Sequence, residues 1–197
     1  MTTLDQNIRN ALEEGTRLRQ SCAEPLTEPL LAAAQAMCGC LQDGGKILAC
    51  GNGGSAADAQ HFVAELVNRF EIDRPGLAAL ALTTDASVTT SISNDFSFLD
   101  VFARQVQALG KPGDVLLAIS TSGTSPNILA AVDAAALADV KVVALTGRDG
   151  GKLGRHAGVD LHLNIPHNST ARVQEMHITC LHILCDLIDQ TLYGESP

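Results

Sequence analysis

The segment from Ser120 to Ser125, with the sequence STSGTS, carries five hydroxyl side chains and one glycine directly after the apolar run DVLLAI. Ser125 is placed to cap a following helix, with Pro126 at its first position. The N-terminus of a helix presents free N–H groups and a positive partial charge, and hydroxyl groups add further donors. A turn and a cap need fewer hydroxyls than this. We therefore expect the loop to bind a phosphate group.

A second polar loop, GNGGSAADAQHF, begins at Gly51 after another apolar run. Its glycines let the backbone come close to a ligand, and Ser55 lies where the next helix starts. The loop lacks the GxGxxG spacing of dinucleotide-binding proteins, and the Ser120–Ser125 loop lacks the lysine of a P-loop. The pair of loops favours a phosphorylated small molecule over a nucleotide.

Polar residues suited to proton transfer occur on two expected helices. His61 and Glu65 are four residues apart, so about 40° separates them around a helix axis. Gln174, His177 and His182 interrupt the apolar stripe of a C-terminal helix, where a buried polar group needs a partner. For each histidine taken alone, a purely structural role is the alternative. Together, the two helices offer an acid, a base and possible metal ligands.

An alternation of strand and helix patterns must position these loops and helices. Nearly continuous apolar runs, typical of strands buried on both faces of a parallel sheet, occupy residues 46–51, 77–82, 114–120, 141–147 and 159–165. Helical patterns lie between them, at about 55–70, 98–109 and 125–138. This alternation predicts an α/β fold, a three-layer sandwich around a five-stranded sheet with right-handed crossovers.

Helical patterns also flank the expected sheet. Two segments, 3–21 and 26–42, precede the first strand and are separated at Glu24-Pro25, while a long helix is expected over 170–193. We find no linker or repeat, so residues 1–197 are predicted to form a single domain, with N-terminal helices in 1–43 and an α/β core in 44–197. The Ala-rich, apolar terminal helices suit an interface between subunits.

Composition excludes several classes of function. A formal net charge of −9 argues against nonspecific binding to nucleic acid or to an anionic membrane. The N-terminus has no signal-peptide pattern, and no apolar stretch is long enough to span a bilayer. Six cysteines without CxxC spacing are expected to be buried, reduced thiols. We expect a cytoplasmic protein.

Five motifs together resemble one family. CGNGGSAADAQHF, SNDFSF, LLAISTSGTSPN, VVALTGRDGGKLG and ARVQEMHI are similar to the sugar isomerase (SIS) domain family and, within it, to the phosphoheptose isomerases. The resemblance covers nearly the whole chain. It implies a flavodoxin-like parallel sheet, a homotetramer, and conversion of sedoheptulose 7-phosphate to D-glycero-D-manno-heptose 7-phosphate, an early step towards the heptose of the lipopolysaccharide core.

The resemblance also assigns roles to residues. It implies that Glu65 is the general base and His182 the general acid. Its zinc ligands, one ion per subunit, match His61, Glu65, Gln174 and His182. Its substrate-binding positions match Asn52, Gly53, Gly54, Ser55, Glu65, Arg69, Asn94, Asp95, Ser120, Thr121, Ser122, Ser125 and Gln174. For Arg69 a solvated helix end is the alternative.

Two other function classes remain open on the sequence. A relative of this family associates with the replication initiator DnaA, and ARVQEMH and LCDLID near the C-terminus resemble it. Glu65, together with His182, favours the enzyme over that non-catalytic binding protein. A phosphosugar-sensing module would need an attached DNA-binding region, which the sequence lacks.

Overall fold

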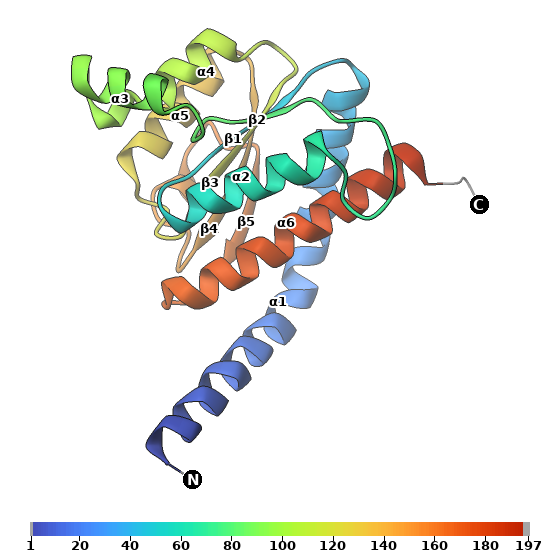
Figure 1. The fold of residues 1–197 in the computed structure, drawn as a ribbon, viewed down its shortest axis with the longest axis vertical. Coiled ribbons are helices and arrows are strands. Elements are labelled where there is room, and N and C mark those ends of the chain that lie inside the picture. Colours follow the sequence, from blue (N-terminus) through green and yellow to red (C-terminus); the bar gives the residue numbers. More distant parts are fainter. Residues whose placement is uncertain (1, 195–197) are drawn as a thin grey trace.

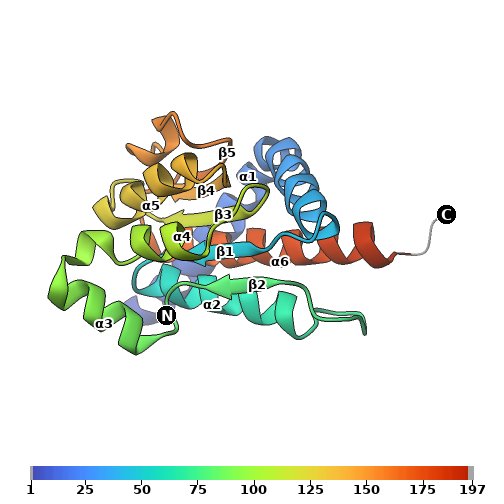
Figure 2. The ribbon, with the colours of Figure 1, turned by 90° about the horizontal axis from the view of Figure 1, so that it is seen from above.

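The computed structural model describes residues 2–194. Five parallel strands form the sheet: β1 (Ile47–Cys50), β2 (Ala79–Ala81), β3 (Val115–Ser120), β4 (Lys141–Gly147) and β5 (Leu161–Ile165). Their spatial order is β2-β1-β3-β4-β5 (Figure 2). This is the flavodoxin-like order, whose switch point lies between β1 and β3. The expected parallel sheet and its five strands are confirmed, with boundaries within two residues of the apolar runs.

Helices cover both faces of the sheet. The helices α1 (Thr3–Gln42), α2 (Gly54–Val67) and α6 (Thr170–Tyr193) share one apolar core with alternate residues of the strands. The helices α4 (Ala103–Leu109) and α5 (Pro126–Leu137) pack against the other face. Alternation of side chains along each strand feeds both cores, as Ile47 and Leu48 do in β1. The three-layer sandwich is confirmed.

The expected break at Glu24-Pro25 is wrong, because α1 is one continuous helix of 40 residues with Pro25 and Pro29 inside it. Each proline removes a backbone hydrogen bond, which costs a few kcal/mol. The buried face of α1 nevertheless continues through both, with Cys22, Leu26 and Leu30 each less than 10% exposed. Continuous packing against α6 and β5 therefore outweighs the missing hydrogen bonds.

The expected helix over 98–109 is also divided differently. A 3-10 turn, η1 (Phe98–Asp100), precedes α4, and a separate helix, α3 (Ala86–Asp95), lies before it. Asp85 caps α3, its carboxylate accepting a hydrogen bond from the Val88 N–H at 2.9 Å. No residue of α3 is buried. A second short 3-10 turn, η2 (Leu153–Arg155), follows β4.

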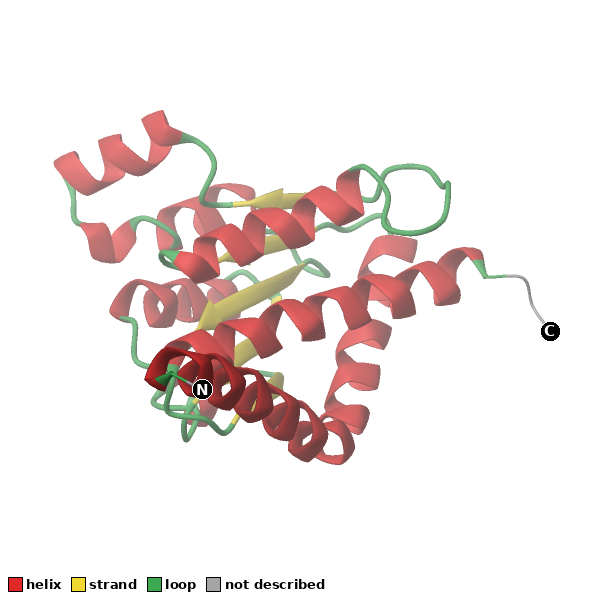
Figure 3. Cartoon of the chain, turned by 60° about the horizontal axis from the view of Figure 1, so that its bottom comes forward, coloured by secondary structure: helices red, strands yellow, loops and turns green. Residues whose placement is uncertain are grey.

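The first part of α1 projects from the body of the molecule (Figure 1). Leu4, Ile8 and Leu12 lie on it at four-residue spacing and are 72%, 62% and 68% exposed. Further along the chain, α2 and α6 run side by side over the sheet (Figures 1 and 3). No helix within residues 2–194 combines the length and the apolarity needed to cross a membrane.

Candidate active site

The Ser120–Ser125 loop leaves the carboxyl end of β3 and enters α5, as the sequence predicts. Ser125 is the N-cap residue and Pro126 the first helical residue, although the Ser125 side chain does not cap the helix. Instead, the Ser120 hydroxyl donates to Ser125 Oγ at 3.1 Å. The hydroxyls of Ser120 and Ser125 thus face each other at the start of α5, where the helix offers its free N–H groups.

The turn inside this loop depends on glycine. Gly123 has φ +62°, and a Cβ on it would lie 2.0 Å from the carbonyl oxygen of Gly150. The loop after β4 therefore packs directly on the Ser120–Ser125 loop, and the Leu153 N–H donates to the Gly123 carbonyl at 2.8 Å. Close backbone contact fixes the shape of the candidate phosphate site from two sides.

The glycine loop after β1 is tied to the Ser120–Ser125 loop by a pair of side-chain amides. Asn52 Nδ2 donates to Asn127 Oδ1 at 2.8 Å, and Asn127 Nδ2 donates to Asn52 Oδ1 at 2.9 Å. Asn127 is only 2% exposed. Sequence reasoning missed Asn127; its signal is a polar side chain at a helix position that faces the core. The two polar loops therefore form one surface at the switch point of the sheet.

Two of the expected substrate residues flank this surface. Ser55, 3% exposed, lies in the first turn of α2. The amide of Gln174 lies against Gly54, so closely that a Cβ on Gly54 would fall 2.2 Å from Gln174 Nε2. Gln174 of α6 therefore reaches the glycine loop, on the substrate side of the site.

The proton-transfer candidates converge further along the same two helices. His61 Nε2 lies 3.1 Å from Glu65 Oε1 and 3.0 Å from His182 Nε2. The two imidazole centroids are 5.0 Å apart. A contact between two ring nitrogens requires that one donates and the other accepts. The structure thus brings Glu65, His61 and His182 into one array around His61 Nε2, which can donate to Glu65 or accept from His182. The array has solvent access, since 46% of the His61 side chain is exposed.

The donor set of this array fits zinc in its chemistry. Two imidazoles and a carboxylate are the ligands of many catalytic zinc sites, and tetrahedral bonds of about 2.0–2.1 Å place donors about 3.3 Å apart. As the side chains stand, residues 2–194 contain no group of three or more His, Cys, Asp or Glu side chains around a metal position. The 3.0 and 3.1 Å separations from His61 Nε2 are close to the donor spacing of such a site. Gln174 lies eight residues before His182, a rise of about 12 Å along α6.

Another carboxyl group lies one turn before His61. Asp58 has one carboxyl oxygen, Oδ2, that is buried without a hydrogen-bond partner. Burial raises the pKa of Asp58 to about 6, and the nearby His61 lowers it in part. Sequence reasoning missed Asp58, whose only signal is its three-residue spacing from His61.

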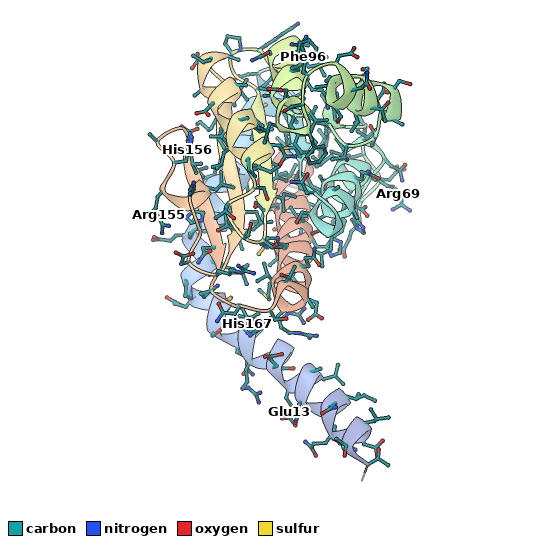
Figure 4. The ribbon with its side chains drawn as sticks, turned by 90° about the vertical axis from the view of Figure 1, so that its left-hand side faces the viewer. Glu13, Arg69, Phe96, Arg155, His156 and His167 are labelled. Atoms are coloured by element: carbon teal, nitrogen blue, oxygen red, sulfur yellow. The ribbon has the colours of Figure 1, made fainter. Side chains whose placement is uncertain are left out.

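The remaining sequence-predicted residues lie apart from these groups in the single chain. Asn94 and Asp95 are exposed on α3, where the Asn94 amide donates to Asp95 at 2.8 Å. Arg69 is exposed in the loop after α2 and extends away from the body (Figure 4).

The two centres of the site are separated along α2. Ser55 and Glu65 are ten residues apart, a rise of about 15 Å. A carbonyl carbon and a phosphorus joined by seven bonds of about 1.5 Å span at most about 10 Å. One chain therefore presents the phosphate loop at the start of α2 and the acid–base array towards its end.

Comparisons with known proteins place this geometry in a family. The SIS domain model matches residues 12–147. The chain belongs to the SIS domain family. It is 56% identical to a phosphoheptose isomerase of Methylibium petroleiphilum, over 100% of this chain and 98% of the relative. A phosphoheptose isomerase of Neisseria meningitidis is 54% identical, with 98% of each chain covered.

Solved structures of phosphoheptose isomerases resemble this chain along its whole fold. Phosphoheptose isomerase GmhA from Neisseria gonorrhoeae aligns with a TM-score of 0.90 at 50% identity, covering 95% of this chain and 100% of that one. A phosphoheptose isomerase from Francisella tularensis gives a TM-score of 0.91 at 44% identity, covering 96% and 100%. The chain is a member of the phosphoheptose isomerases within the SIS family. These relatives give no support to the alternative of a protein that associates with DnaA.

Proposed function

We propose that the protein is an aldose-ketose isomerase that converts sedoheptulose 7-phosphate to D-glycero-D-manno-heptose 7-phosphate. The observation that carries this function is the array of Glu65, His61 and His182, in which His61 Nε2 lies 3.1 Å from the Glu65 carboxylate and 3.0 Å from His182 Nε2. Relatives named phosphoheptose isomerase, at 56% identity over the full chain, support the substrate. The reaction supplies a precursor for the heptose of the lipopolysaccharide core.

The isomerisation moves one proton between adjacent carbons and one between their oxygens. Glu65 removes a proton from C1 of the ketose, and the electron pair forms the C1–C2 double bond of an enediol. His182 protonates the oxygen at C2 and, then neutral, takes the proton from the oxygen at C1, which regenerates the acid. Glu65 then returns a proton to C2, which leaves the aldehyde at C1. His61 lies between the two groups, with Nε2 within hydrogen-bonding distance of both, and holds them in register.

The phosphate end of the substrate is bound by the two loops. Ser120, Thr121, Ser122 and Ser125 surround the start of α5, and Asn52, Gly53, Gly54 and Ser55 form the adjoining wall. Gln174, which contacts Gly54, binds sugar hydroxyls. Neutral hydroxyls and backbone N–H groups bind a dianion without the desolvation cost that a buried cation carries.

Zinc is part of the proposal as a ligand of this array. His61, Glu65 and His182 would hold the ion. Gln174, the fourth ligand of the family pattern, contacts Gly54 at the other end of the same chain's site, so a glutamine as fourth ligand would come from another copy. When bound, zinc would polarise the substrate oxygens and stabilise negative charge on the enediol. Removing metal with a chelator and adding zinc back measures its contribution to turnover.

We also propose that the protein acts as a homotetramer in the cytoplasm and that each site is shared between copies. The roughly 15 Å rise along α2 between Ser55 and Glu65 supports sharing, because it exceeds the span of about 10 Å from the substrate's carbonyl carbon to its phosphorus. The exposed Leu4, Ile8 and Leu12 support association. Six buried free cysteines support a reducing compartment. Light scattering should give about four times 20.6 kDa; a monomer at micromolar concentration would contradict the tetramer.

Sharing of sites can be tested by mixing inactive variants. Glu65→Gln lacks the base and Ser120→Ala with Ser125→Ala lacks the phosphate hydroxyls. If the two centres of one site come from different copies, mixed oligomers contain some sites with both centres intact and regain activity. Failure of every mixture, under conditions in which subunits are seen to exchange, would assign each site to one chain.

The test of the proposed reaction is turnover of sedoheptulose 7-phosphate by the purified protein. Glu65→Gln and His182→Gln should each lose roughly 10² to 10⁴ in rate, which is typical when one proton-transfer group is removed. Both variants should still bind the sugar phosphate. Wild-type protein that binds the substrate and converts none, with or without zinc, would refute the isomerase function.

A further inference from the structure

The C-terminal end of α2 is capped only in part: the N–H of the C-cap residue Asn68 donates to the Ala64 carbonyl at 3.0 Å, which leaves the later carbonyls of the last turn to other partners. The helix ends at Val67, and its last turn contains no basic residue. Carbonyl groups at such an end need partners from elsewhere and favour a nearby positive charge. Arg74, in the loop that follows, provides both: Nη2 donates to the Glu65 carbonyl at 2.9 Å and Nη1 to the Leu66 carbonyl at 2.8 Å.

The same guanidinium joins α2 to α6. Arg74 Nε donates to Asp189 Oδ1 at 2.6 Å, and the two side chains are 0% and 4% exposed. Asp189 comes seven residues after His182, two helical turns, so the two residues lie on nearly the same face of α6. One buried ion pair therefore connects the backbone of the proposed base to the helix of the proposed acid.

The loop that carries Arg74 also contacts the acid directly. The Phe70 ring stacks on the imidazole of His182, with 5.6 Å between centroids and 29° between planes. The loop is closely fitted to the end of α2, since the Leu77 N–H donates to the Leu66 carbonyl at 2.9 Å. A Cβ on Gly76 would lie 2.5 Å from the Val67 carbonyl oxygen. Residues 68–77 thus contact both proton-transfer residues, Glu65 through its backbone carbonyl and His182 through its ring.

We propose that Arg74, Asp189 and Phe70 are positioning residues that set the geometry between Glu65 and His182. This inference rests on the proposed function. A buried ion pair is weak evidence for stability, because the cost of removing two charges from water offsets much of their attraction. Here the guanidinium makes contacts that an ion pair alone does not need, including the Glu65 carbonyl. Its effect is on the distance and angle between two groups that must act on adjacent substrate atoms.

Two substitutions at Arg74 separate positioning from stability. Arg74→Lys keeps the charge but lacks the planar fork with which Arg reaches Asp189 and the carbonyls of Glu65 and Leu66 together. Arg74→Met removes the charge and leaves Asp189 unpaired. The control is Lys46→Met, which removes the cation from another ion pair, Lys46–Asp114, with a partly buried lysine and a buried aspartate at the amino ends of β1 and β3. Phe70→Leu keeps an apolar side chain and removes the stacked ring.

Positioning predicts a loss in kcat with KM unchanged. A misplacement of about 1 Å costs up to about 10² in rate, so kcat should fall roughly 10-fold to 100-fold in both Arg74 variants, measured below their melting temperatures. KM should stay within about twofold, because the phosphate loops are distant. Lys46→Met should lower the melting temperature and leave kcat as in the wild type.

The second readout does not depend on turnover. Imidazole ¹H–¹⁵N resonances of His182 and His61, recorded on chelator-treated protein, should shift in Arg74→Lys and Phe70→Leu and not in Lys46→Met. Unchanged kcat and unchanged resonances in folded Arg74→Lys or Phe70→Leu would overturn the inference. If neither Arg74 variant folds, Phe70→Leu decides it. If the wild type turns over no sugar phosphate, the proposed function fails, and the resonances alone test the positioning.

Discussion

The amide pair between Asn52 and Asn127 allows a sharp test of how the two phosphate loops are held together. Asn127→Asp is nearly isosteric and changes one nitrogen to oxygen. The hydrogen bond from Asn52 Nδ2, now 2.8 Å, can remain, while the 2.9 Å bond from Asn127 Nδ2 becomes a contact between two acceptors. The change therefore acts on a single interaction at a 2% exposed residue.

The expected destabilisation follows from that lost interaction. One hydrogen bond contributes about 0.5–1.5 kcal/mol, and a buried acceptor left without a donor costs about 1–3 kcal/mol. The free energy of unfolding should thus fall by about 2–4 kcal/mol at pH 7. The new carboxyl, buried against an acceptor, has a folded-state pKa above its unfolded value near 3.9. The penalty should shrink as the pH falls through that raised pKa, because the protonated acid donates to Asn52.

Urea unfolding at pH 7 and pH 5, together with KM for the sugar phosphate, measures both effects. KM should rise because the loops that contact the phosphate separate, while binding at the acid–base array is untouched. Asn164→Asp, at a partly exposed amide of β5, is the control for a new negative charge near the same edge of the sheet. A folded Asn127→Asp protein with wild-type stability and KM would refute the role of the amide pair.

Two further predictions concern buried groups beside these loops. His177 is 0% exposed, and its Nε2 lies 3.0 Å from the Thr146 carbonyl oxygen. Burial lowers its pKa from 6.5 to about 4. Because the unfolded chain binds this proton more readily, the free energy of unfolding is at its full value above pH 6.5 and falls by about 3 kcal/mol as the pH drops to about 4. Urea unfolding across this range should show that slope, and His177→Gln should reduce it; an equal slope in both proteins would contradict the assignment. Gly123→Ala combines a positive φ with a Cβ 2.0 Å from Gly150 O. It should therefore lower the free energy of unfolding by about 2–5 kcal/mol and raise KM for the sugar phosphate. An unaltered melting temperature would contradict this prediction.

The sheet and its loops were predictable because their signals are local and strong. In an alternating α/β pattern, a short continuous apolar run such as residues 114–120 is typical of a strand buried on both faces of the sheet. Ser120–Ser125 follows such a run directly, so its place at the carboxyl end of a strand followed from the strand itself. The i, i+4 spacing of His61 and Glu65 likewise fixed their shared face.

Elements governed by tertiary contacts were not predictable in the same way. Pro25 usually ends a helix, and only the packing of Cys22, Leu26 and Leu30 on both sides of it keeps α1 continuous. α3 contains β-branched and hydroxyl residues of low helix propensity. Asp85, which caps α3, was the one local signal for this helix, and the prediction of a helix over 98–109 did not use it.

The supporting residues of the site were hidden for a different reason. Asn127, Arg74 and Asp189 act through partners between 8 and 115 residues away in the sequence. A single sequence contains no record of such pairs. The catalytic, substrate-binding and zinc-binding roles of all the candidate site residues stay predictions, as does the division of the chain into residues 1–43 and 44–197.

Proton transfer by Glu65 is the central claim, and conversion of sedoheptulose 7-phosphate in D₂O tests it most directly. NMR follows both the rate and the deuterium that enters C2 of the aldose. The wild type should form the aldose with deuterium at C2 wherever the proton on Glu65 exchanges with solvent before its return. Glu65→Gln, folded and still binding the sugar phosphate, should be slower by roughly 10² to 10⁴ in both conversion and deuterium uptake. A Glu65→Gln protein that converts the substrate at the wild-type rate would contradict the account.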